Sequence, residues 1–156
     1  MSGANDFDFL IGGWQVEHHR LEGRLTGATK WDIAHGTDVV EKCFLESGNR
    51  GCFKREFDGL RYEGMPLRLY DPNTDLWSIY WLDTIDHRME PPVLGGFKNG
   101  EGLFIGDDIL RGNKIKVRYR WFDIDENSAT WDQAYSADQG KTWEVNSIMK
   151  FTRVEN

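Results

Sequence analysis

The sequence predicts an all-β fold, a single antiparallel up-and-down barrel of about 8–11 strands with a short N-terminal helical turn. Apolar and polar residues alternate in short stretches, and turn residues separate these stretches at spacings of about 8–12 residues. No stretch of about twelve residues shows the apolar spacing of a helix. Closing such a sheet into a barrel removes its exposed edges.

The elements follow from this alternation in chain order. One helical turn fits at Ala4–Leu10, before the first alternating stretch. The alternation then predicts strands at Ile11–Leu21, Ala28–His35, Thr37–Glu46, Gly51–Asp58, Met65–Tyr70, Leu76–Asp83, Pro92–Phe97, Gly102–Ile109, Lys114–Phe122, Ala129–Ser136 and Trp143–Thr152. Between them, Asp71-Pro72 and Asn99-Gly100 give the clearest turn signals, because Pro fixes φ and Asn-Gly favours a hairpin.

Length and charge limit the classes of function. The 156 residues suit one domain, and we expect a single β-barrel domain over 1–156. The net charge of −7 argues against nucleic acid and anionic membranes as partners, because both need basic patches. The first residues lack a basic start and an apolar stretch, so we expect a cytoplasmic protein. In that compartment Cys43 and Cys52 are expected to be free thiols, although a cross-strand disulfide between them is conceivable.

Two motifs have local structural explanations. Gly12-Gly13-Trp14 contains the Gly-x-Trp that opens lipocalins and their calycin relatives, in which a late Arg packs over the Trp, and Arg153 occupies the matching place here. Residues 136–143 fit the Asp-box pattern Ser-x-Asp-x-Gly-x-Thr-Trp. Since propellers repeat that motif and this chain has one copy, we interpret it as a stable hairpin and not as a mark of glycosidase activity.

Taken together, the chain resembles a family of small bacterial proteins of unknown function with a calycin-like, lipocalin-like β-barrel. The resemblance extends over the whole chain and is carried by residues 7–14, 67–72, 77–81, 117–121, 131–136 and 151–153. It implies a fold, and it implies no catalytic residues. Some calycin barrels hold a haem on a single histidine, which here would be His18. We nevertheless expect no cofactor, and no metal, because His18 and His19 must point to opposite faces of one strand.

Alternation along each strand predicts which side chains line the barrel, if the more apolar face is taken as the interior. The inward set is Trp14, Val16, His18, Arg20, Val39, Glu41, Cys43, Leu45, Trp77, Ile79, Trp81, Val117, Tyr119, Trp121, Trp131, Gln133, Tyr135, Val145, Met149 and Phe151. Arg68, Arg118 and Arg120 fall outside. A register different by one residue would bring these arginines inside and favour an anionic ligand.

This set describes a cavity with aromatic walls and a few polar groups, which is the usual form of a small-molecule site. The candidate ligand-binding residues are His18, Arg20, Glu41, Trp81, Tyr119, Trp121, Trp131, Gln133 and Met149. A filled core in which Glu41 pairs with Arg20 explains the same pattern.

We therefore expect a protein that binds a small hydrophobic or aromatic molecule. The alternative is an enzyme of the lyase, isomerase or cyclase type, with His18 and Glu41 as its catalytic acid–base pair. A small-molecule ligand is the expected partner, and a homodimer is also compatible with the sequence.

Overall fold

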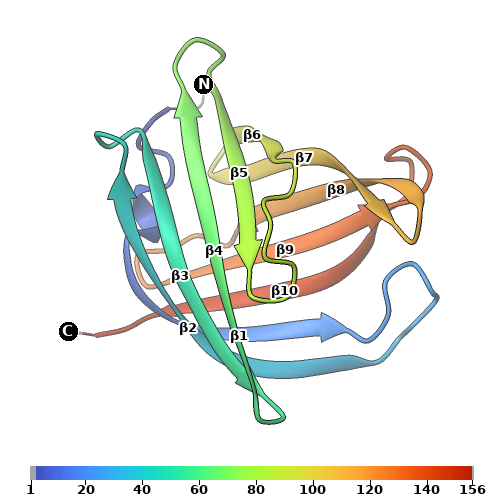
Figure 1. Ribbon diagram of the computed structural model, residues 1–156. Helices are drawn as coiled ribbons and strands as arrows, with labels where there is room; N and C mark the ends of the chain where they lie inside the picture. Colours follow the sequence, from blue (N-terminus) through green and yellow to red (C-terminus); the bar gives the residue numbers. More distant parts are fainter. Residues whose placement is uncertain (1–2, 156) are drawn as a thin grey trace.

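A computed structural model describes residues 3–155 as a closed antiparallel barrel of ten strands, in which each strand pairs with the next and β1 pairs with β10 (Figure 1). A 3-10 turn at Asp8–Leu10 precedes the barrel. The strands are β1 (Gly12–Leu21), β2 (Trp31–Cys43), β3 (Gly48–Phe57), β4 (Leu60–Asp71), β5 (Leu76–Asp83), β6 (Val93–Lys98), β7 (Glu101–Leu110), β8 (Asn113–Phe122), β9 (Ser128–Ser136) and β10 (Glu144–Arg153). The predicted all-β, up-and-down fold is confirmed.

The largest differences from the predicted strand boundaries are in β2 and β4. The stretches expected on either side of Gly36 form the single strand β2. Gly36 is present because β3 passes close by, and a Cβ there would lie 2.4 Å from the carbonyl oxygen of Lys54. β4 begins earlier than expected, since Asp58 and Gly59, both with positive φ, form a tight hairpin directly after β3.

The predicted alternation is correct on most strands and wrong by one residue on β2. Trp14, Val16 and His18 of β1 are buried as expected. On β2, however, Asp38 and Val40 are the buried residues. Val39 and Glu41 are exposed, and Cys43 shares their outward face, while Leu45 is exposed in the turn after β2. Choosing the more apolar face failed on this strand because its inward face carries an aspartate.

β4 and β10 contain two further corrections. Arg68 of β4 is buried inside the barrel, whereas Arg118 and Arg120 remain on the outer face of β8 as expected. Val145 does not share the face of Met149, because a bulge between Val145 and Ser147 shifts the pairing of β10 with β9.

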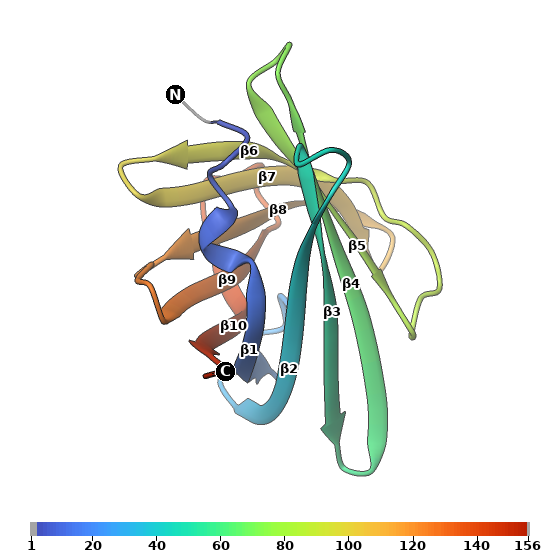
Figure 2. The same ribbon diagram turned by 90° about the vertical axis from the view of Figure 1, so that its left-hand side faces the viewer.

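The N-terminal segment closes one end of the barrel. Figure 2 shows this segment, in blue, crossing the end at which β1 begins. Phe7 packs edge-on against Trp77 and Phe97, with ring centroids 4.9 Å away in each case. The expected contact at the chain's other end is also present, with the Arg153 guanidinium 4.3 Å from the Trp14 ring centroid. Arg153 also donates to the carbonyl oxygens of Phe9 and Ile11, both at 2.7 Å.

The hairpin between β9 and β10 is closed by its own side chains. Asp138 Oδ1 accepts from the Thr142 backbone N–H at 2.9 Å, and Ser136 Oγ accepts from the Gly140 N–H at 2.8 Å. Gly140 has φ +89°. The Trp143 ring lies 3.5 Å from where a Cβ on Gly140 would be, so the indole covers the turn.

Cys43 and Cys52 are free thiols. Cys52 pairs with Val39 across β2 and β3, while Cys43 pairs with Gly48, so the cysteines are several residues out of register and cannot bond. The described part of the chain contains no helix with the length and apolar character needed to span a lipid bilayer.

Candidate functional site

A cavity of about 230 Å³ lies inside the barrel. The N-terminal segment closes the barrel at one end of it. A cavity of this size can hold a small organic molecule. β5, β8 and β9 supply the aromatic wall of Trp81, Tyr119, Trp121, Trp131 and Tyr135. These rings reach the cavity because each strand directs every second side chain inward.

Most of the predicted site residues line this cavity. They are His18, Trp81, Tyr119, Trp121, Trp131, Gln133 and Met149. Arg20 shares a face of β1 with His18 but is not among the lining residues. Glu41 is wrong as a site residue, because it lies on the outer surface with its carboxylate 3.7 Å from the Arg50 guanidinium. The structure therefore separates Glu41 from His18, and the proposed acid–base pair does not form.

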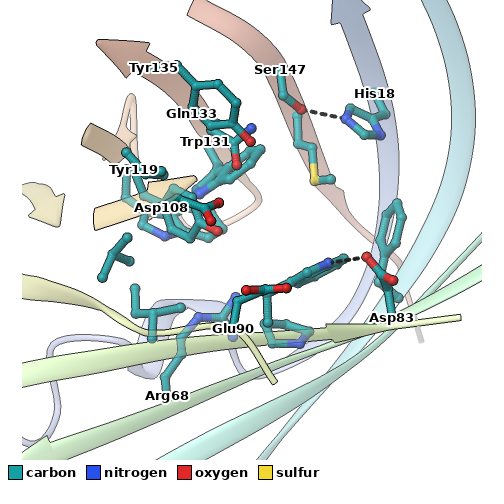
Figure 3. Close-up of a pocket in the computed structure, with 18 of the residues that line it drawn as sticks. His18, Arg68, Asp83, Glu90, Asp108, Tyr119, Trp131, Gln133, Tyr135 and Ser147 are labelled. Carbon is teal, nitrogen blue, oxygen red and sulfur yellow. Dashed lines mark hydrogen bonds between the residues drawn. The ribbon is translucent and has the colours of Figure 1, made fainter. Parts of the chain in front are cut away.

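His18 is held between two polar partners in the cavity wall. Arg55 donates to Nδ1 at 2.8 Å, and Nε2 lies 2.6 Å from Ser147 Oγ, the contact dashed in Figure 3. A guanidinium can only donate, so Nδ1 must accept and Nε2 carries the hydrogen that Ser147 accepts. Burial, aided by the charge of Arg55, lowers the pKa of His18 to about 3. Because the Nε2 that faces Ser147 already carries a hydrogen, His18 cannot act as the base that would activate the Ser147 hydroxyl.

A second polar group, Asp38, Asn49 and Arg68, lies toward the closed end of the barrel. Arg68 extends from β4 into the interior (Figure 3), and its Nη1 donates to Asn49 Oδ1 at 2.8 Å. Its Nε has no hydrogen-bond partner, and neither has Asp38 Oδ1. Arg68 and Asp38 are 4% and 2% exposed. We call these three residues the floor cluster.

The opposite end of the cavity carries charges of both signs. Arg24 donates to the Tyr135 hydroxyl at 2.9 Å. Asp83 accepts from the Tyr62 hydroxyl at 3.0 Å and from Trp81 Nε1 at 2.9 Å, which fixes both rings. Further lining carboxylates are Asp86, Glu90, Asp107 and Asp108.

Sequence reasoning missed the floor cluster and the charged end for two different reasons. Arg68 and Asp38 belong to the two strands whose inward faces were assigned wrongly. Asp86 and Glu90 lie in the connection between β5 and β6, where no alternation indicates direction. The Asp58-Gly59 hairpin signal could have extended β4 back to Tyr62, because Asp-Gly fixes the register of a hairpin.

No arrangement suited to a metal ion occurs among residues 3–155, which contain no group of three or more His, Cys, Asp or Glu side chains that could hold one. His19 points away from His18, and its Nε2 lies 2.5 Å from a Glu17 carboxylate oxygen outside the barrel.

Comparisons with known proteins bear on the architecture. No protein-family model matches the chain, and no curated protein matches it. Among solved structures, it is similar to a redesigned β-barrel with a TM-score of 0.54 and 11% sequence identity, over 99% of this chain and 100% of that chain. Because likeness at so low an identity extends to the fold alone, the comparisons show that this chain is an all-β closed barrel.

Proposed function

We propose that this protein binds a small aromatic or apolar molecule inside its barrel. The observation that carries the proposal is the cavity of about 230 Å³, whose wall includes the rings of Trp81, Tyr119, Trp121, Trp131 and Tyr135. Aromatic pairs prefer edge-to-face or offset geometry, and the wall already contains such a pair in Tyr119 and Trp131, with ring centroids 5.1 Å apart. A planar ligand would add a further ring to this arrangement.

The polar groups of the wall restrict how such a ligand lies. Gln133 is tied to Asn146 by a hydrogen bond of 2.8 Å, and His18 is tied to Ser147 and Arg55. These side chains are fixed before any ligand enters, so binding does not require them to be ordered. Because both ring nitrogens of His18 are occupied, the geometry favours binding over the acid–base chemistry expected of a His18–Glu41 enzyme.

Calorimetric titration with indole, 2-naphthol and 3-phenylpropanamide tests the proposal. We expect saturable binding of at least one probe to the wild-type protein. Met149→Trp should abolish it by filling the cavity. Ile148→Trp is the matched control, because Ile148 pairs with His19 on the outward face of β10. Absence of binding by all three probes, or equal binding by Met149→Trp and the wild type, would contradict the proposal.

A further inference from the structure

The floor cluster contains a buried cation whose hydrogen-bonding capacity is largely unused. A guanidinium carries five N–H donors, and Arg68 directs Nη1 to the neutral amide oxygen of Asn49 while Nε has no partner. Among the described residues, no carboxylate lies within 4.0 Å of Arg68 to form an ion pair. Buried charges are normally paired, because removing them from water costs several kcal/mol.

Asp38 shares the floor cluster with Arg68 and supplies its negative charge, but it forms no ion pair with Arg68. Its Oδ1 is buried and has no hydrogen-bond partner. Burial raises the pKa of Asp38 in spite of the charge on Arg68. An anion beside Arg68 would favour the neutral form of Asp38 further, and a neutral carboxyl group can donate a hydrogen bond.

The surroundings of Arg68 select for a flat, singly charged group. The guanidinium lies 5.3 Å from the Phe7 ring centroid and 5.7 Å from that of Trp121, so two aromatic rings limit access to it. Tyr119 lines the same cavity, and burial raises the pKa of its hydroxyl, which stays a donor. One guanidinium matches one carboxylate in geometry and charge, whereas a phosphate dianion would need a second cation.

We infer that Arg68 is a carboxylate-binding residue, and that the ligand of this barrel is a small aromatic carboxylic acid. Its carboxylate contacts Arg68 at the floor cluster, and its ring lies between the aromatic side chains of β5, β8 and β9. This inference rests on the proposed binding function and specifies the chemical class of the ligand. A purely structural Arg68 predicts instead that an acid and its neutral amide bind equally.

Calorimetry with 3-phenylpropanoate and 3-phenylpropanamide at neutral pH separates these outcomes. We expect the wild type to bind the acid at least about tenfold more tightly than the amide. The double variant Arg68→Met/Asp38→Asn removes both charges of the floor cluster and should bind the two probes within about threefold of each other. Arg118→Met is the matched control on the outer face of β8, where the guanidinium lies 4.9 Å from the Trp143 ring centroid; it should keep the wild-type preference.

Equal affinities of acid and amide for the wild type would overturn the carboxylate assignment and leave the binding function standing. A double variant that keeps the acid preference would overturn it too. If neither probe binds the wild type, the carboxylate assignment fails, and the proposed function fails with it only if indole and 2-naphthol also do not bind. Should the double variant not fold, Tyr119→Phe gives a second measurement, because it retains the ring and removes one donor. It should weaken acid binding severalfold and amide binding less, because the hydrogen bond to a charged acceptor is the stronger one, and unchanged acid binding would overturn the assignment.

Discussion

Acid should destabilise this barrel more steeply than its His18→Gln variant. The folded protein holds the pKa of His18 at about 3, whereas an unfolded chain has the ordinary value near 6.5. As the pH falls below 6.5, His18 binds a proton in the unfolded state and not in the folded state. Stability that is present at neutral pH is therefore lost progressively down to about pH 3. Each pH unit in this window costs about 1.4 kcal/mol, which gives about 2–3 kcal/mol between pH 7 and about pH 4.5.

His18→Gln is a suitable reference because the amide can keep both hydrogen bonds. Its oxygen can accept from Arg55 and its nitrogen can donate to Ser147, as the neutral imidazole does. Urea unfolding at the two pH values gives the free energy of unfolding of each protein. We expect the wild type to lose about 2–3 kcal/mol more than the variant.

His35→Gln provides the matched control, since the His35 side chain is 75% exposed, and it should follow the wild type. Parallel losses in wild type and His18→Gln would refute the reasoning, because they would mean that the folded protein accepts the proton on His18.

Two further variants test the closed end and the aromatic wall. Phe7→Ala should lower the free energy of unfolding, measured with urea, by about 3–5 kcal/mol, because Phe7 is 1% exposed among aromatic rings. Phe44→Ala, on an exposed turn, should lower it little. Equal losses would show that the N-terminal segment does not seal the barrel. Gly64→Ala would place a Cβ 2.3 Å from the Trp81 indole, so it should lower the free energy of unfolding by about 1–3 kcal/mol and shift the Trp fluorescence. Gly13→Ala is the control, because its Cβ would meet nothing closer than 3.8 Å. An unshifted spectrum in Gly64→Ala would contradict the packing of Trp81 on Gly64.

The sequence predicted the inward face of a strand correctly where the two faces of that strand differ clearly in apolar character. In β8 and β9, aromatic residues occupy one face, and Tyr119, Trp121 and Trp131 line the cavity as predicted from alternation alone. β4 contains Leu67-Arg68-Leu69, where the apolar residues lie outside and the arginine inside. A rule based on apolar character reverses such a strand, because it cannot detect a cation that aromatic rings and a distant carboxylate stabilise.

Glu41 shows the same limit of choosing the more apolar face, because it was predicted inside and lies outside. Alternation through Val39 placed this carboxylate in the cavity with His18, but the inward residues of β2 are Asp38 and Val40. The pairing of β2 with β1 and β3 fixes this register, and those contacts join residues that are distant in the chain. Whether a ligand occupies the cavity stays a prediction for the titrations above.

The sequence by itself determined that this chain forms an all-β barrel, because period-2 alternation and turn residues are local properties. It also indicated the contact between Trp14 and Arg153 that helps to close one end. Only the tertiary structure decided which charges enter the interior. A one-residue difference in register exchanges the two faces of a strand, and strand pairing across the closed barrel sets that register. For this reason Arg68 lies inside the barrel and Glu41 lies outside it. The buried arginine is what makes an aromatic acid the proposed ligand.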